Sequence, residues 1–380
     1  MMDGRERLHV ALSHREPDRI PIDFGGYLTT SISLEAWKPL VKHLGIPWDG
    51  RMTSHRCQLP EIPESLLEEY GVDTRNVYSG DVNEPSGSDG VEHRYTDRWG
   101  IVWERAVGEP FINRVAPLQS LTNPGPAEVH KLDWPDPSLL VPDCRELRME
   151  AERHKGNGHA VVIGIPARTI SLAQRLRGFD TWLLDTIRSP AFAEALLAKC
   201  VEIGLEATRS VLEQIGDLVD VAFWSDDMGM GSGPLVSPAT FRAIIKPYQK
   251  RIVEQVRELS AAKIVVHSDG GVAPLIPDWV EIGVDAINPV QHNLGAVKGM
   301  DPAELKREYG GDISFWGGID TSHVLPFCGP QEVRAEVRRR IDELAPGGGF
   351  VLASVHNVQP EVPPENVVAM LEAAADYGAY

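Results

Sequence analysis

The chain has little cysteine and no long apolar run. Cysteine occurs only at Cys57, Cys144, Cys200 and Cys328, and no two of these form a Cys-x-x-Cys pair. This scatter indicates neither a disulfide framework nor a local zinc knuckle. No apolar stretch reaches the roughly 20 residues that a membrane span requires. The N-terminus is charged and lacks the apolar core of a signal peptide. We therefore expect a cytoplasmic protein.

Positive charge is also scarce. The chain has 37 Lys and Arg against 55 Asp and Glu, which gives a formal net charge of -18. Such a chain repels nucleic-acid phosphates and anionic lipid, so we expect neither nucleic acid nor a membrane surface as partner. The sequence also has no phosphate-binding loop and no GxSxG elbow. Chemistry on a small molecule is the function that remains favoured.

Short apolar runs alternate with helix signals along the chain, as parallel strands and their crossover helices do. The predicted strands cover 19–26, 76–81, 159–165, 218–227, 263–269, 285–290, 313–320 and 350–357. The clearest helix covers 330–344, where apolar residues form one stripe. Another begins at a Ser237 cap and is predicted to restart at Pro247.

This repeated unit predicts one α/β domain over residues 1–380, a (β/α)₈ TIM barrel with catalytic residues at the C-terminal strand ends. Residues 82–158 interrupt the rhythm and contain the alternating segment EHRYTDRWGIVWERAV, which is typical of a β-hairpin. We interpret them as an insertion after the second strand. A doubly wound open sheet is the alternative, although no GxGxxG follows the first strand.

If the barrel forms, the polar residues that end the strands share one rim. They are Asp23, Tyr78, Asp81, Arg168, Asp226, Asp227, His267, Asp269, Asn288, Gln291, Asp320, His356 and Asn357. Among these, Tyr78, Arg168, Asn288, Gln291, Asp320 and Asn357 are predicted to bind substrate.

The run VVHSDGG carries the sharpest candidate site. Side chains alternate along a strand, so His267 and Asp269 point the same way, and His356 ends the last strand. Two imidazoles and a carboxylate suit Zn²⁺ or a similar divalent ion and leave one position open for substrate. In the alternative interpretation, both histidines form hydrogen bonds within the rim and Asp269 caps the next helix.

Asp226 and Asp227 are adjacent, so on a regular strand only one of them faces the barrel axis. That residue is a candidate general acid or base, and the other is expected to bind backbone. The alternative is that both cap the glycine-rich loop 228–233. Arg168 is the basic residue at a predicted strand end, where it would hold a substrate carboxylate or pair with a rim aspartate.

Several segments are similar to the uroporphyrinogen decarboxylase superfamily. They include GPLVSPATFRAIIKPY, VVHSDGGVAPLIPDWVEIGVDAINPVQ, FWGGID and VHNVQPEVPPEN. The resemblance implies a (β/α)₈ barrel with its active site in a C-terminal cleft, and a dimer. It also implies one of two chemistries, the cofactor-free decarboxylation of uroporphyrinogen or cobalamin-linked methyl transfer by zinc enzymes.

Departures from the two family patterns separate these chemistries. The decarboxylases carry RQAGR after the first strand, whereas this chain has PIDFGGYLTTSIS, without arginine. We therefore expect a pocket too poor in positive charge to bind an octa-anionic porphyrinogen. The zinc methyltransferases carry His-x-Cys-Gly, which resembles His267-Ser-Asp269-Gly here with one ligand changed. A His/Asp/His set is harder than His/Cys/Cys, which weakens the implication of a thiol acceptor.

The resulting hypothesis is a methyltransferase-like enzyme that moves a methyl group between a small methylated substrate, or a corrinoid protein, and an acceptor. His267, Asp269 and His356 would hold the metal, His356 would also serve catalysis, and Asp226 or Asp227 would act as acid, base or orienter. The runner-up is a metal-independent decarboxylase with one of these aspartates as acid and Arg168 as carboxylate clamp. A third hypothesis is a binding protein without chemistry.

Overall fold

A curled parallel sheet forms the centre of the computed structural model, which describes residues 2–77, 94–106, 109–293 and 299–380. All neighbouring strands of this seven-stranded sheet pair in parallel and follow one another in chain order. They are β3 (Thr74–Asn76), β7 (Ala160–Gly164), β8 (Val221–Ser225), β11 (Lys263–His267), β12 (Ala286–Asn288), β13 (Ser314–Trp316) and β14 (Phe350–Val351).

Residues 20–23 lie between the two ends of this sheet. The Leu352 N–H donates to the Pro21 carbonyl at 2.9 Å, and Ile22 forms a parallel bridge with Leu352. On the other side, the Asp73 N–H donates to the Ile22 carbonyl at 2.9 Å. Backbone hydrogen bonds thus connect β14 through this segment to the start of β3. The predicted barrel is confirmed, with its first strand reduced to a short extended segment.

Alternating side chains of the strands build two apolar layers. On β7, Ala160 and Val162 belong to the cluster inside the barrel, whereas Val161 and Ile163 pack outward against the helices. Helix α1 (Gly4–Ala11) contributes Leu8 to the inner cluster and contacts β7 and β14. Because the interior is filled with side chains, a ligand site has room only above this layer.

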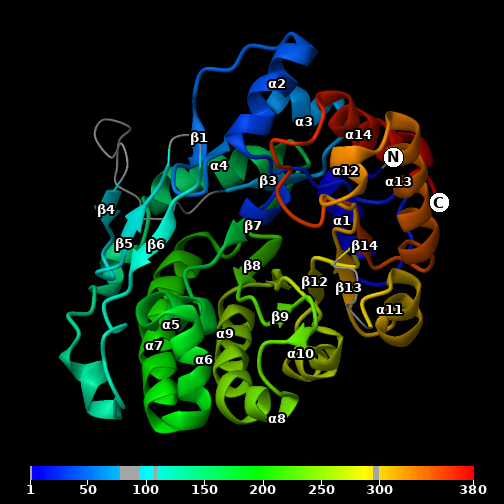
Figure 1. Ribbon diagram of the computed structural model, residues 1–380. Coiled ribbons are helices and arrows are strands. Elements are labelled where there is room, and N and C mark those ends of the chain that lie inside the picture. Colours follow the sequence, from blue (N-terminus) through cyan, green and yellow to red (C-terminus); the bar gives the residue numbers. More distant parts are fainter. Residues whose placement is uncertain (1, 78–93, 107–108, 294–298) are drawn as a thin grey trace.

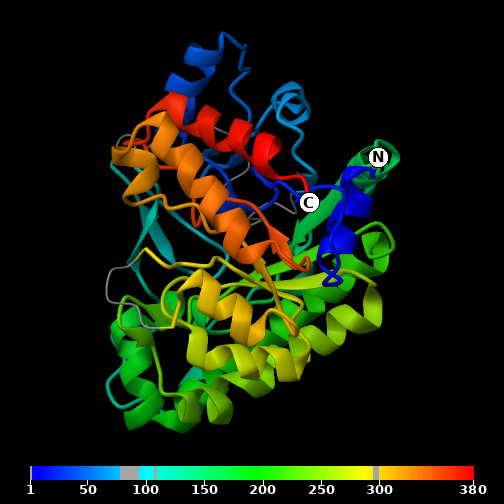
Figure 2. The ribbon, with the colours of Figure 1, turned by 90° about the vertical axis from the view of Figure 1, so that its right-hand side faces the viewer.

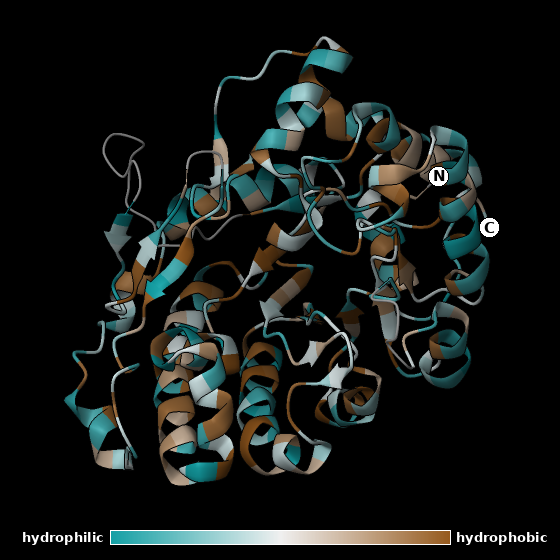
Figure 3. Cartoon of the chain, viewed as in Figure 1, coloured by the Kyte–Doolittle hydropathy of each residue, from teal (hydrophilic) through white to brown (hydrophobic). Residues whose placement is uncertain are grey.

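Helices surround the sheet, and each carries both hydrophobic and hydrophilic residues (Figures 1, 2 and 3). The longer ones are α2 (Leu34–Leu44), α4 (Cys144–Gly156), α5 (Ile170–Arg177), α6 (Phe179–Arg188), α7 (Pro190–Ile215), α9 (Lys246–Leu259), α11 (Pro302–Tyr309), α13 (Pro330–Leu344) and α14 (Pro364–Tyr377). The shorter ones are α3 (Glu64–Glu69), α8 (Pro238–Thr240), α10 (Ile276–Ile282) and α12 (Val324–Phe327). Within the described ranges, none of the helices has the length and apolarity to cross a membrane.

Two helix predictions are confirmed in detail. Helix α13 covers the predicted residues and buries its apolar stripe. The Ser237 side chain caps α8, and α9 restarts with Pro247 in its first turn after a π-helical turn at Phe241–Ile245. A π-turn places an extra residue in the helix, which accommodates the missing N–H of proline.

A three-stranded antiparallel sheet lies beside the barrel (Figure 1) and follows β3 and precedes α4 in the chain. It consists of β4 (Arg94–Thr96), β5 (Val102–Glu104) and β6 (Ile112–Val115). The predicted hairpin is β4–β5, whereas the third strand was not predicted. All four residues of β6 are exposed, so the strand has no alternation of buried and exposed side chains that a sequence pattern would reveal. A second small hairpin, β1 (Met52–Ser54) with β2 (Leu59–Pro60), follows α2.

Candidate functional site

A cavity of about 280 Å³ opens at the C-terminal ends of the barrel strands. Strand ends and the loops after them contribute Gly164, Ser225, His267 and His356 to its lining. The three-stranded sheet region contributes Trp99, so the predicted insertion forms one wall. The cavity lies where the barrel fold places catalytic residues.

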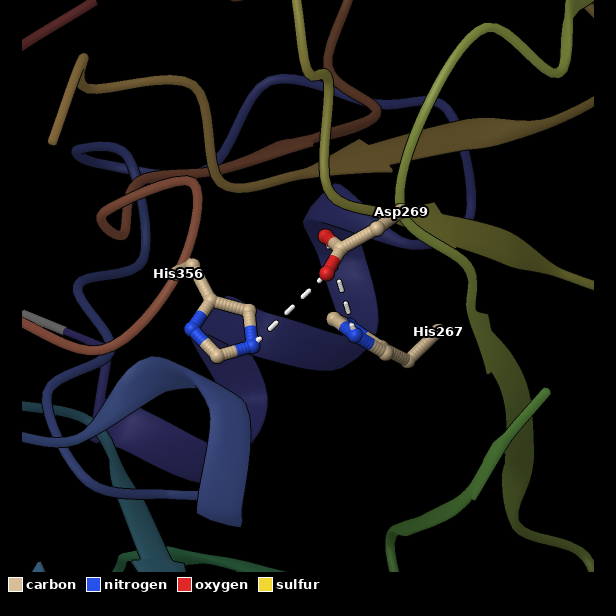
Figure 4. Close-up of side chains that lie close together, drawn as sticks. All are labelled: His267, Asp269 and His356. Carbon is tan, nitrogen blue, oxygen red and sulfur yellow. Dashed lines mark ion pairs between the residues drawn. The ribbon is translucent and has the colours of Figure 1, made fainter. Parts of the chain in front are cut away.

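His267, Asp269 and His356 converge beside this cavity (Figure 4). The two histidines line it, whereas Asp269 is not among the lining residues of the described part of the chain. One potential ligand atom from each lies within 4.8 Å of the others. Asp269 lies between the two rings, with Oδ1 3.8 Å from His267 Nε2 and Oδ2 3.8 Å from His356 Nε2. These separations leave space for an ion among the three atoms, because metal–ligand bonds to such atoms are about 2.0–2.2 Å long.

Neighbouring groups set the tautomer of His267. Its Nδ1 lies 2.6 Å from Asn288 Oδ1, and the Asn288 amide nitrogen donates to the Trp316 carbonyl at 3.1 Å. With the amide nitrogen directed to Trp316, the amide oxygen faces His267 and accepts from Nδ1–H. Nε2 is therefore the ring nitrogen directed toward Asp269. A metal-binding histidine is normally oriented by such a hydrogen bond on its other nitrogen.

Asp269 is positioned by a tight contact between two loops. Its N–H donates to Asp227 Oδ1 at 3.1 Å, and the next residue, Gly270, has a φ of +88°. A Cβ on Gly270 would lie 2.2 Å from the carbonyl carbon of Gly229, so only glycine fits there. The sequence HSDGG is thus explained by the need to turn the chain directly after a rim carboxylate.

The Asp269 carboxylate also supports a metal site. Its Oδ1 is buried and has no hydrogen-bond partner among the described residues. It does not cap the following 3₁₀ turn, Ala273–Leu275, as the alternative interpretation required. An unpartnered buried carboxylate oxygen costs free energy unless a cation or a proton satisfies it. Two imidazoles and one carboxylate therefore fit Zn²⁺ or a similar ion.

His356 reaches the site from the loop after β14, and its imidazole is directed toward Asp269 in Figure 4. Enclosure in the cavity lowers the pKa of His356, and the His267 ring lowers it further. The carboxylates of Asp269 and Asp227 act in the opposite direction but do not cancel this effect. The imidazole is therefore neutral near pH 7, which is the state that a metal ligand requires.

The adjacent aspartates after β8 have different environments. Asp226 is fully buried and accepts hydrogen bonds from the N–H groups of Thr169 and Ser171 and from the Thr169 hydroxyl. Within the described part of the chain, Asp226 is not among the residues that line the cavity. Its carboxylate instead holds the start of α5. Asp227 lines the cavity, with Oδ1 3.7 Å from His267 Nε2. Asp227 is thus the one of the pair that can reach a substrate.

Arg168 also lines the cavity, as predicted for a substrate-binding residue. Its guanidinium donates to the carbonyls of Ile165 and Ala167, and its Nη2 lies 3.5 Å from the hydroxyl of Tyr27. Within the part of the chain that the structure describes, no rim aspartate forms an ion pair with it. The salt bridge weighed as an alternative is therefore not formed there.

Arg56, after β1, and Arg175, on α5, bring further positive charge to the cavity. Their guanidinium carbons lie 5.1 Å and 5.7 Å from the centroid of the Trp103 ring on β5. Arginines thus line the cavity although none follows the first strand. The charge comes from a loop and a helix instead.

The remaining predicted residues differ in position. Asn357 lines the cavity and accepts from the Ser31 N–H at 3.1 Å. Gln291 accepts a hydrogen bond from the Gly270 N–H, and Asp320 accepts from the N–H groups of Ser322 and His323. Both residues therefore stabilise loops and are not among the lining residues of the described part of the chain. Tyr78 and Asp81 lie outside the described residues.

Tyr27, Arg56, Cys57 and Arg175 are among the lining residues that sequence patterns did not reveal. Tyr27 follows the glycine pair that ends the first predicted strand, and this place after a strand is the only signal that could have indicated it. The other three lie in a connecting loop and on a helix, where no local pattern marks a ligand-facing position.

Glu64, Glu68 and His159 form a second group of potential metal ligands. The Arg75 guanidinium lies in this group, with Nη2 2.6 Å from Glu64 Oε1 and 3.4 Å from His159 Nε2. A fixed cation already satisfies the carboxylate, so this group is better explained as an ion-pair network.

Comparisons with known proteins agree with the motifs and the fold. The family model described as "Uroporphyrinogen decarboxylase (URO-D)" matches residues 119–377. The uroporphyrinogen decarboxylase of Methylococcus capsulatus is 24% identical over 332 residues, covering 84% of this chain and 85% of that protein. That of Pseudomonas fluorescens is 29% identical over 294 residues, covering 74% of each.

A solved structure described as a methyltransferase from Methanosarcina mazei shares the fold. It superposes with a TM-score of 0.65 at 18% sequence identity and covers 99% of both chains. At this identity the likeness concerns the fold alone. Through the family match over residues 119–377, together with the barrel and the motifs at its rim, this chain belongs to the uroporphyrinogen decarboxylase (URO-D) family.

Proposed function

We propose that this protein is a metal-dependent, methyltransferase-like enzyme of the URO-D family. It would move a methyl group between a small methylated substrate, or a corrinoid protein, and an acceptor. The observation that carries the proposal is the convergence of His267, Asp269 and His356, whose ligand atoms lie within 4.8 Å of one another. The two histidines of this group line the cavity. A decarboxylase that works without a cofactor has no need of such a ligand set.

Zn²⁺ is the ion that best suits two imidazoles and a carboxylate with one position open toward a cavity. When bound, such an ion supplies Lewis acidity to an oxygen, nitrogen or sulfur atom of the substrate or acceptor. His267 is oriented for binding by Asn288, and Asp269 by the N–H contact to Asp227. The chain thus holds the ligands in place by its own hydrogen bonds.

Asp227 is placed to move a proton. Its side chain is 51% exposed and lies beside both His267 and Asp269. A carboxylate there accepts a proton from the acceptor group as it becomes a nucleophile. Asp226, enclosed and fully hydrogen-bonded, instead fixes the loop from which Asp227 projects.

Decarboxylation of a small carboxylated substrate is the second candidate, and the arginines favour it. Arg56, Arg168 and Arg175 line the cavity, and guanidinium groups are suited to binding carboxylates. In this function Arg168 holds the substrate and Asp227 donates a proton to the developing carbanion. Both curated relatives described above are decarboxylases, although a cavity of about 280 Å³ is small for a tetrapyrrole.

Metal content tests the first proposal. Protein purified without chelator and without a nickel column should contain about one divalent ion per chain by elemental analysis, and His267→Ala should lose it. His159→Ala, in the ion-pair network around Arg75, is the matched control and should retain the metal. A metal-free wild-type protein that releases carbon dioxide from a candidate acid would replace the proposal with the decarboxylase.

Methyl transfer itself needs a separate assay. Methylation of a corrinoid changes its absorbance spectrum, so candidate methyl donors can be mixed with free corrinoid and the protein and followed by spectroscopy. Turnover that requires both the metal and Asp227 would support methyl transfer. Tight ligand binding without turnover, unaffected by His356→Ala, would indicate a binding protein.

A further inference from the structure

Tyr27 and Arg168 stand together on the cavity wall, and both present donors to it. The Arg168 Nη2 lies 3.5 Å from the Tyr27 hydroxyl oxygen. A guanidinium can only donate, so the phenol oxygen accepts this contact and its own proton remains to be donated. Among the described residues, no acceptor takes that proton.

Backbone carbonyls hold the Arg168 guanidinium, and the buried Asp226 carboxylate is near enough for the charge of Arg168 to lower its pKa. Its Nη1 donates to the Ile165 carbonyl and, at 2.8 Å, to the Ala167 carbonyl, which fixes the plane of the group. Within the described ranges no carboxylate forms an ion pair with it. A half-buried guanidinium without a carboxylate in direct contact is poorly solvated, and an anionic ligand bound to it would relieve this cost.

Tyr27 is also positioned firmly. Its ring stacks on Phe223 with centroids 4.4 Å apart and planes 14° from parallel. A Cβ at position 164 would lie 2.9 Å from the Tyr27 ring, so Gly164 makes the space that the ring fills. Burial raises the pKa of Tyr27, outweighing the opposite effect of Arg168, so the phenol stays protonated near neutral pH and remains a donor.

The other walls of the cavity define the rest of the ligand. Apolar side chains of Leu28, Leu59, Trp99, Leu140 and Leu172 line part of it, beside polar side chains that include Arg56 and Arg175. Its volume of about 280 Å³ is at the lower end of ordinary ligand pockets. A molecule that fits this cavity is small and combines an apolar part with an anionic end.

We propose that Arg168 and Tyr27 form a carboxylate-binding subsite, in which Arg168 forms the ion pair and Tyr27 donates its hydroxyl proton to the same carboxylate. The substrate is therefore a small carboxylic acid with an apolar body. The inference rests on the proposed function only in placing the substrate in this cavity. It holds equally for methyl transfer and for decarboxylation, and it does not depend on a bound metal.

Binding of benzoate and of benzamide, its neutral amide, tests the subsite by calorimetric titration of the full chain near neutral pH. Benzoate should bind wild-type protein about tenfold or more tighter than benzamide, because a hydrogen bond to a charged group is the stronger one. Tyr27→Phe keeps the ring and should weaken benzoate about tenfold. Arg168→Gln should abolish the preference for the acid. Arg114→Gln, on the exposed strand β6, is the control and should bind as wild type.

Equal binding of acid and amide, or no benzoate binding at millimolar concentration, would overturn the inference. Benzoate binding that survives Arg168→Gln but is lost in His267→Ala would also overturn it, because the carboxylate would then bind at the histidine site. That result would at the same time support the metal site. Loss of metal in His267→Ala with benzoate affinity unchanged would support both proposals independently.

Discussion

Asn288 Oδ1 accepts a hydrogen bond from Nδ1 of His267 at 2.6 Å, while the same amide donates to the Trp316 carbonyl at 3.1 Å. The contact leaves His267 Nε2 available at the cavity. Asn288 was predicted to bind substrate, but its position assigns it to orienting His267.

Asn288→Leu should weaken metal binding about 10–100-fold, the usual cost of removing a partner that orients a ligand. The variant keeps the side-chain bulk but removes the acceptor for Nδ1–H, so the ring loses both its tautomer and its orientation. Competition with a zinc chelator measures the affinity. An unchanged affinity, in a variant that melts near the wild-type temperature, would show that Asn288 does not act through His267.

Gly270→Ala should destabilise the protein and displace Asp269. The added Cβ would lie 2.2 Å from the Gly229 carbonyl carbon, and the φ of +88° at position 270 is unfavourable for alanine. We expect a loss of about 1–3 kcal/mol in the free energy of unfolding, measured by urea denaturation, together with reduced metal content.

Gly231→Ala is the matched control, because its Cβ would have open space and its φ is not positive. This variant should have the stability and metal content of wild type. Equal behaviour of the two variants would mean that the loop contact does not position Asp269.

Asp226→Asn and Asp227→Asn should separate stability from activity. Asp226 accepts from Thr169 and Ser171, so an amide nitrogen in place of one oxygen would face a donor. We expect a loss of about 1–3 kcal/mol in unfolding free energy. Asp227→Asn should leave stability nearly unchanged and lower kcat about 10²–10⁴-fold if Asp227 transfers a proton.

Both variants need parallel urea titrations and turnover measurements. If Asp227→Asn turned over as wild type, proton transfer by Asp227 would be excluded. If Asp226→Asn were fully stable, the three donors around Asp226 would contribute nothing to the free energy of unfolding.

Asp220, at the opposite end of the barrel, should make stability depend on pH. Burial by itself raises the pKa of Asp220, but hydrogen bonds from His9 at 2.7 Å and the Val161 N–H at 3.0 Å bring it below its usual value. The stabilisation is therefore present above the unfolded pKa of about 3.9 and is lost as pH falls through the lower folded pKa.

Asp220→Asn should accordingly be less stable than wild type at pH 7 by about 1–3 kcal/mol, and the difference should shrink below about pH 4. Urea denaturation of both proteins at several pH values measures it. A difference that stays constant down to pH 3 would show that the charge of Asp220 contributes nothing.

Sequence patterns predicted the barrel because its signals are local. Apolar runs in the sequence identify β7, β8 and β11 without any knowledge of their neighbours in the fold. Pro247 likewise identifies the restart of its helix from the local sequence alone. The exposed strand β6 carries no such pattern and was missed. The first strand was predicted too long, because bridging two neighbours needs only a few residues.

The residues of the candidate site likewise differ in whether the local sequence alone could predict their positions. His267 and Asp269 are two positions apart, so strand alternation alone brings them to one side. That Asp227 rather than Asp226 faces the cavity depends on donors from Thr169 and Ser171, far away in the sequence. Arg56 and Arg175 come from segments without any sequence signal, so only the tertiary structure places them in the cavity lining.

The sequence by itself determined the alternation of strands and helices, the glycine turn after Asp269 and the kinds of ligand atoms available, because these depend on residues close together in the chain. Only the tertiary structure decided that His356 meets His267 and that Tyr27 stands beside Arg168. The physical reason is closure of the sheet. Hydrogen bonds from residues 20–23 to both of its ends bring the first and last strands together, and no local pattern encodes that distance.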